Sequence, residues 1–134
     1  MILLDTCALI WAVNRDPMSA PALKSIQRAT KAGELFLSPV SAWKIGLLAS
    51  RGRLSFGVPA DVYVSRAFSA PGVRIAALSP QIAVRSSSLP GNFHADAADR
   101  LLVSTAMLMG LKLVTRDWQI LSYGAQGHVS VLPC

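Results

Sequence analysis

Acidic residues are scarce in this chain, and the scarcity makes their positions informative. It has seven Asp and Glu against 13 Lys and Arg, a formal net charge of +6, and a pI near 10.0. This excess of positive charge favours a polyanionic partner, nucleic acid before a membrane surface. The basic residues are dispersed along the sequence, so a folded surface rather than a tail is expected to bind such a partner.

Long apolar runs and cysteines are also few. No stretch of about 18 uninterrupted apolar residues is present to span a bilayer, and Asp5 interrupts the apolar N-terminus, which has no basic segment before it. The two cysteines, Cys7 and Cys134, lie near opposite ends of the sequence. Without a signal peptide, we expect reduced thiols and a cytoplasmic location. No G-x-G-x-x-G follows the first apolar run, which argues against a dinucleotide enzyme.

Hydrophobic residues make up 52% of the 134 residues, which is enough for one folded domain over residues 1–134 and argues against disorder. The expected strands are short and continuously apolar, as buried parallel strands are. They cover 1–4, 35–37, 73–78, 112–115 and 129–132. Between them, serine caps, early prolines and terminal glycines mark helices. The expected helices cover 6–13, 20–32, 39–50, 59–69, 80–88 and 97–109, with a helical turn at 118–123. This alternation predicts an α/β fold with three layers (α/β/α) around a mainly parallel sheet.

Four of the seven acids stand where predicted elements change. Asp5 ends the first strand, Asp117 ends the fourth, and Asp96 and Asp99 open the helix at 97–109. In open parallel sheets, ligands bind beyond the carboxyl ends of the strands, so these acids are expected to converge there. Carboxylates repel one another, and such a cluster is stable when a cation lies among it. Oxygen ligands suit Mg²⁺ or Mn²⁺, and a metal-bound water can attack a phosphodiester.

Each acid also has a simpler interpretation. Asp5, Asp96 and Asp117 each precede a helical segment, where Asp is a favoured N-cap that contributes about 1 kcal/mol. Asp99 lies inside its helix on the apolar edge, where a carboxylate needs a cation or strong donors. A phosphoacceptor domain with an acidic Mg²⁺ pocket is a rival class. It expects paired acids after the first strand and an Asp after the third, where this chain has Ser79.

Six segments taken together resemble the PIN-domain ribonucleases, and within them the VapC-type toxins of prokaryotic toxin–antitoxin modules. These segments are 1–6, 37–43, 51–54, 89–103, 113–117 and 120–124. The resemblance covers nearly the whole chain and implies a parallel sheet between helices. It also implies Mg²⁺- or Mn²⁺-dependent endoribonuclease activity on RNA, a homodimer, and inhibition by a cognate antitoxin protein. By this resemblance Asp5, Asp99 and Asp117 are the catalytic metal ligands, and Asp96 is an additional metal-site acid.

Lys44 departs from the family pattern, which has a glutamate directly after the tryptophan at position 43. Lys44 falls in the middle of the apolar arc of its helix. Either its stem packs on the core while the ammonium reaches solvent, or the ammonium lies among the carboxylates. At about 4 Å and an effective dielectric constant near 20, one charge pair is worth roughly 4 kcal/mol as an upper guide. We therefore expect impaired metal binding and low nuclease activity. The alternative function is a catalytically weak PIN protein that binds RNA or an antitoxin as a regulatory partner.

Four further residues are candidates for substrate contact. Thr115 could orient a carboxylate or a water, or be an ordinary strand residue. His94 could bind a substrate phosphate, or hold the structure of its loop. Arg100 and Arg116 flank metal-site acids and could pair with a carboxylate, a substrate or an antitoxin group, or be ordinary solvated charges.

Aromatic and basic side chains elsewhere could contact RNA. Trp11, Trp43 and Trp118 could stack on bases, although Trp11 and Trp43 lie in apolar helices, where core or dimer contacts are commoner. Arg51 and Arg53 could contact the RNA backbone, or be solvated charges. The apolar helices near the N-terminus carry more hydrophobic residues than a monomer needs, which fits a partner surface.

Overall fold

A parallel five-stranded sheet forms the centre of the fold in the computed structural model, which describes residues 1–53 and 55–134. The strands are β1 (Ile2–Leu4), β2 (Leu35–Leu37), β3 (Val73–Ile75), β4 (Lys112–Thr115) and β5 (Val131–Pro133). Their order is β3-β2-β1-β4-β5, and every pairing between them is parallel. Leu4 is in register with Val114, so β1 and β4 end side by side.

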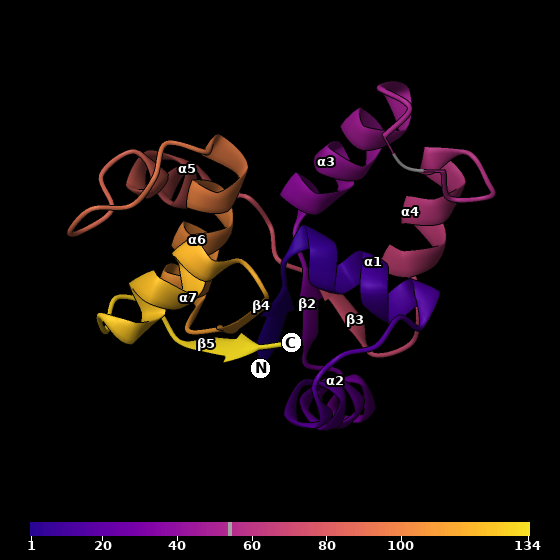
Figure 1. Cartoon of the computed structure of the whole chain (residues 1–134), viewed down its shortest axis with the longest axis horizontal. Helices are drawn as coiled ribbons and strands as arrows, with labels where there is room; N and C mark the ends of the chain where they lie inside the picture. Colours follow the sequence, from indigo (N-terminus) through magenta and orange to yellow (C-terminus); the bar gives the residue numbers. More distant parts are fainter. Residues whose placement is uncertain (54) are drawn as a thin grey trace.

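Seven helices in the described residues cover the two faces of this sheet (Figure 1). They are α1 (Thr6–Asn14), α2 (Ala20–Ala32), α3 (Pro39–Ser50), α4 (Ala60–Phe68), α5 (Pro80–Ser86), α6 (Ala97–Met109) and α7 (Trp118–Ala125). Helices α5, α6 and α7 lie together on one side, and α1, α3 and α4 on the other. Helix α2 packs on β1 and β2.

The central strand supplies side chains to both hydrophobic cores. Leu3 packs with Leu102 of α6 and Ile120 of α7, whereas Ile2 and Leu4 pack in the other core, which includes residues of α1, α2 and α4. Successive side chains of a strand point to opposite faces, so a strand buried on both faces must be apolar throughout. The predicted three-layer α/β/α arrangement is confirmed.

Several predicted bounds hold and others do not. The helices at 20–32, 39–50 and 97–109 and the strands at 35–37 and 112–115 are found as predicted. The third strand was expected to run to residue 78 but ends at Ile75, because its partner β2 ends at Leu37, where Ser38 already caps α3. The last strand begins at residue 131, later than predicted. The turn expected at 118–123 is a full helix to Ala125.

Three further expectations from the sequence concern the 51–54 motif, the cysteines and membrane spans. Leu54, the last residue of the 51–54 motif, lies outside the described residues. Cys7 and Cys134 have free thiols, the first exposed and the second half-buried. No helix in the described ranges is long and apolar enough to cross a membrane.

Candidate metal centre

A pocket of about 820 Å³ brings together all four acids that the sequence singles out. It is lined by Asp5, Thr6, Cys7, Ile10, Trp11, Lys44, Leu48, Arg53, His94, Asp96, Ala98, Asp99, Leu102, Arg116, Asp117 and Gln119. These residues come from the carboxyl ends of β1 and β4, from the helices α1, α3, α6 and α7, and from the loops after α3 and before α6. The predicted convergence of carboxylates at one edge of the sheet is therefore present.

Two of the acids at strand ends are also helix caps. Asp5 Oδ1 accepts a hydrogen bond of 2.7 Å from the backbone N–H of Ala8. Asp117 Oδ1 accepts from the backbone N–H groups of Gln119 and Ile120, at 2.9 and 3.1 Å. Each cap is made by one carboxylate oxygen, which fixes the direction in which the other oxygen points. The cap and cluster interpretations are therefore both correct for the same residues.

The remaining pair of acids is joined in a similar way at the start of α6. Asp96 Oδ1 accepts a hydrogen bond of 2.9 Å from the backbone N–H of Asp99. Asp96 is exposed, and Asp99 is half-buried. The cap therefore holds the exposed carboxylate at the rim and the half-buried one inside the pocket.

Thr115 connects the ends of the two central strands. Its Oγ1 donates a hydrogen bond of 2.5 Å to Asp5 Oδ2 and accepts one of 3.0 Å from the backbone N–H of Asp117. The residue is completely buried. Thr115 thus orients a carboxylate, as one of its two sequence interpretations states, and its burial leaves no surface for the substrate contact considered beside it.

Burial of these carboxyls has an electrostatic cost. Burial raises the pKa of Asp5 above its ordinary value, against the hydrogen bonds from Thr115 and Ala8, and repulsion from Asp117 adds to the rise. Burial also raises the pKa of Asp99 to about 6, with further repulsion from the neighbouring carboxylates. The nearby side chains of His94 and Lys44 oppose this rise in the pKa of Asp99. A site that holds carboxylates under such repulsion favours a cation.

His94 contributes a nitrogen atom to the acid cluster. Its Nε2 lies 3.0 Å from Asp99 Oδ2. That nitrogen is buried and makes no hydrogen bond within the described part of the chain. Ligand atoms of His94, Asp99 and Asp117 all lie within 4.8 Å of one another. An unpartnered imidazole nitrogen beside two carboxylates is a donor set that fits a divalent metal ion.

The sequence interpretations of His94, phosphate binding or loop structure, did not include this approach to Asp99. The only signal for His94 in the sequence is that it precedes two acids in one short loop, and that spacing fixes no direction for its side chain. Asp5 lies in the same pocket but outside the trio of His94, Asp99 and Asp117.

Arg100 explains how the loop before α6 is held. Its Nε donates to the carbonyl of Ser86 at 2.7 Å, and Nη1 donates to the carbonyls of Phe93 and His94 at 3.0 and 3.1 Å. The guanidinium therefore fastens the loop to the end of α5 and places His94. Arg100 does not line the pocket, and these bonds give it a positioning task in place of the predicted substrate contact.

Arg116, in contrast, lies on the pocket wall. Its Nε donates to the carbonyl of Cys134 at 2.9 Å, and Nη2 donates to the carbonyl of Pro17 at 3.1 Å. The guanidinium lies over the ring of Trp11, 3.9 Å from its centroid. Trp11 is thus a half-buried pocket residue rather than a core one. Lys44 and Arg53 also line the pocket, which gives it a basic wall beside the acids.

Lys44 lies in the same pocket as the acids, on α3. Its charge lowers the pKa of Asp99 against the other contributions, so the ammonium is within electrostatic reach. Among residues 1–53 and 55–134, it forms no ion pair within 4.0 Å. Lys44 therefore faces the acid cluster from across the pocket without contacting a carboxylate oxygen.

Comparison with known proteins agrees with this geometry. The sequence matches the family model for the PIN domain over residues 2–125. It is 30% identical to Ribonuclease VapC22 of Mycobacterium tuberculosis (strain ATCC 25618 / H37Rv) over 131 residues, which cover 97% of each chain.

Solved structures resemble the whole fold. VapBC2 from Rickettsia felis, bound to a DNA fragment from its promoter, matches with 16% identity and a TM-score of 0.72, over 99% of this chain and 98% of that one. DNA-bound VapBC from Salmonella typhimurium matches with 15% identity and a TM-score of 0.68, over the same shares. FitAcB from Neisseria gonorrhoeae matches with 22% identity and a TM-score of 0.64, over 98% and 96%. At these identities the likeness shows a shared fold.

Proposed function

The chain belongs to the PIN-domain family, and from this premise we propose that it is a divalent-metal-dependent endoribonuclease that acts as the toxin of a toxin–antitoxin pair. The observation that carries the proposal is the approach of His94, Asp99 and Asp117 to within 4.8 Å at one edge of the sheet. A relative at 30% identity is a ribonuclease, which supports RNA as the substrate. The basic wall of the pocket suits a phosphate backbone.

Acidic residues and one histidine would hold the metal ion. Asp5, Asp99 and Asp117 would hold Mg²⁺ or Mn²⁺, with His94 as a further ligand and Asp96 assisting from the rim. When bound, the metal would supply a water molecule of lowered pKa that can attack a phosphodiester, and its positive charge would stabilise the charge that builds on the phosphate.

The rest of the pocket prepares the site and the substrate. Thr115 keeps the carboxylate of Asp5 in one orientation through its hydrogen bond. Lys44, Arg53 and Arg116 attract the RNA backbone, because positive side chains beside the pocket neutralise phosphates.

We also propose that Lys44 weakens metal binding. The family resemblance places a glutamate at this position, so the lysine changes the local charge by two units, from −1 to +1. The ammonium lies within electrostatic reach of Asp99 and therefore competes with a cation for the same negative potential. The nuclease activity of this sequence is accordingly expected to be low.

The proposed partners are a cognate antitoxin and a second copy of the chain. The proposed location of the protein is the cytoplasm. Neighbouring structures include VapBC complexes, which supports an antitoxin partner. Apolar side chains are exposed on the helices near the N-terminus, among them Val13 (44% exposed), Leu23 (42%) and Trp43 (58%). A protein partner that covers these side chains would remove apolar surface from water.

Lys44 also favours a second candidate function. If its charge suppresses catalysis fully, the protein would bind RNA or its antitoxin without cutting, as a regulatory partner. The two candidates share the fold and the pocket and differ only in turnover.

The test is RNA cleavage by the purified, antitoxin-free chain and its Lys44→Glu variant, with Mn²⁺ and with a chelator. Under the first candidate, both proteins cut RNA in Mn²⁺, the variant faster, and the chelator stops both. The double variant Lys44→Glu/Asp117→Asn keeps the N-cap and serves as the inactive control. Cleavage by the Lys44→Glu variant but not by the unaltered chain supports the regulatory candidate. No cleavage by either protein would overturn the nuclease assignment.

A further inference from the structure

A second, smaller pocket lies directly beside the acid cluster. Its volume is about 140 Å³, and it is formed by the loop before α6 and the exposed face of α7. His94 and Gln119 line both this pocket and the large one. The two pockets are therefore neighbours, and a chain-like ligand that reaches the acids can extend past His94 and Gln119 toward the smaller pocket.

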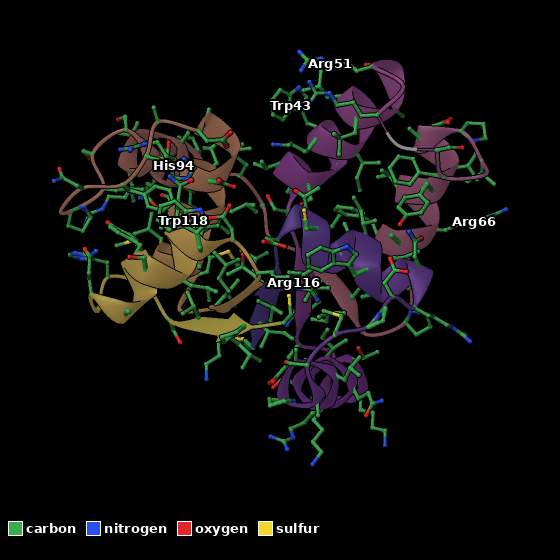
Figure 2. All side chains as sticks on the ribbon, viewed as in Figure 1. Trp43, Arg51, Arg66, His94, Arg116 and Trp118 are labelled. Atoms are coloured by element: carbon green, nitrogen blue, oxygen red, sulfur yellow. The ribbon has the colours of Figure 1, made fainter. Side chains whose placement is uncertain are left out.

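The most exposed aromatic residue at this place is Trp118. It directly follows Asp117 as the first residue of α7, and it is 73% exposed. Figure 2 shows Trp118 and His94 together on the side of α6 and α7. A tryptophan offers a large rigid apolar face, and its exposure to water costs free energy unless a ligand covers it.

Polar side chains surround this indole. Ser122 follows Trp118 by one helical turn and shares its face of α7, and Gln126, the residue that caps the end of α7, follows one turn later. Asn92, on the facing loop, completes the polar rim, and Phe93 supplies a second aromatic side chain. An aromatic face bordered by amides and a hydroxyl matches a planar heterocycle with donors and acceptors on its edge.

We propose that this pocket, the Trp118 subsite, binds one unpaired base of the RNA, stacked on the Trp118 indole, while the adjoining phosphate lies at the acid cluster. The inference rests on the proposed function. Base–aromatic stacking tolerates any base, and amides at the rim can favour some bases over others. Because a paired base is stacked within its own duplex, the Trp118 subsite selects single-stranded or looped RNA.

The chemistry of the subsite favours a nucleobase over a protein partner. The pocket has room for one ring system and not for a helix, and it adjoins a pocket whose wall carries Lys44, Arg53 and Arg116. Trp43, 58% exposed on α3, lies in a separate groove with Leu47, Leu48, Arg51 and Arg53. That groove also includes Lys44 and Asp96 of the large pocket. Trp43 is therefore the comparison that separates stacking on Trp118 from stacking on any exposed indole near the basic wall.

The experiment measures the binding of a short single-stranded RNA that carries 2′-O-methyl groups and so resists cleavage. Fluorescence anisotropy, with a chelator present, gives the Kd for the unaltered chain and for Trp118→Ala, Trp118→Phe and Trp43→Ala. We expect Trp118→Ala to raise the Kd roughly 5- to 150-fold. Trp118→Phe retains most of the affinity because it keeps an aromatic face, and Trp43→Ala binds like the unaltered chain.

Other outcomes separate the subsite from the function on which it rests. If the unaltered chain binds the RNA and Trp118→Ala binds equally well, the subsite is wrong and the nuclease proposal stands. If Trp118→Ala keeps RNA affinity but loses a co-expressed antitoxin, Trp118 is a protein contact instead. If the unaltered chain binds no RNA at all, both proposals fall. Thermal unfolding of each variant checks folding, which an exposed position should not affect.

Discussion

Thr115 and Asp5 lie 110 positions apart in the sequence and are joined by a hydrogen bond of 2.5 Å from Thr115 Oγ1 to Asp5 Oδ2. The same hydroxyl accepts the backbone N–H of Asp117 at 3.0 Å. One buried side chain therefore sets the relative positions of two acids that stand at the ends of neighbouring strands. The site depends on this contact as much as on the acids themselves.

Replacing Thr115 by valine tests this dependence, because valine keeps the branched shape and removes the hydroxyl. The buried carboxylate of Asp5 and the N–H of Asp117 each lose a partner, so the free energy of unfolding should fall by about 1–3 kcal/mol. Mn²⁺ affinity should fall as well. Urea denaturation and metal titration measure the two effects. Thr115→Ser restores the hydroxyl and should recover both, and an unchanged valine variant would show that the contact is dispensable.

A charge series at position 44 measures the influence of the lysine on the metal site. Mn²⁺ affinity should rise from Lys44 to Lys44→Gln to Lys44→Glu, by roughly tenfold or more across the series, because the change of two charge units acts directly on the acid cluster. The rise of the melting temperature on addition of Mn²⁺ reports the affinity. Equal shifts for all three proteins would place the ammonium outside the site.

The raised pKa of Asp99 makes the stability of the metal-free protein depend on pH. The carboxyl has a pKa of about 6 when folded and a lower ordinary value of 3.8. Between these values the folded state binds more protons than the unfolded state, so the free energy of unfolding decreases as pH rises through this window. Asp99→Asn should flatten this dependence, whereas Asp61→Asn, at an exposed acid of α4, should leave it intact. Unfolding in a chelator at a series of pH values provides the measurement.

Metal binding should respond to pH with the opposite sign. A carboxylate must lose its proton to bind a cation, so Mn²⁺ affinity should increase as pH rises toward and past about 6 and then level off. Calorimetric titration at several pH values gives this profile. An affinity that stays constant from about pH 5 to about pH 8 would exclude Asp99 as a ligand.

His94 predicts a preference between metals. Imidazole nitrogen suits Mn²⁺ better than Mg²⁺, which prefers oxygen ligands and retains its water. His94→Ala should therefore lower Mn²⁺ affinity more than Mg²⁺ affinity, as measured by calorimetry. The other histidine, His128, stacks on Tyr123 outside the large pocket, and His128→Ala is the control. Equal losses for both metals in His94→Ala would contradict a ligand role for its nitrogen.

The sequence was sufficient to predict the layers and the place of the acids. Short apolar strands, serine caps and terminal glycines locate most elements, and parallel topology brings the ends of β1 and β4 together. The length of β3 was overestimated because a strand ends where its neighbour ends. Leu37 terminates β2 for reasons that lie in α3 and not in the sequence of β3.

Side-chain directions within the site could not be predicted in the same way. His94 meets Asp99 because Arg100 holds three carbonyls around that loop, and because the Tyr123 hydroxyl donates to the carbonyl of Pro90. These contacts join segments that no periodicity relates. The direction of the Lys44 side chain could not be predicted either. A helical wheel shows on which side of α3 the side chain begins, but the position of the ammonium depends on its four rotatable bonds.

Three of the pocket acids begin the helices that follow them, whereas Lys44 lies within α3 and caps nothing. Replacing one of these three acids by a residue that cannot cap therefore loosens the fold together with the chemistry, whereas exchanging the residue at position 44 removes no cap. During evolution, a substitution at position 44 would therefore cost less folding stability than one at a capping acid. A protein that keeps its fold and its inhibitor binding but cleaves RNA slowly is then only one substitution away from a fully active nuclease.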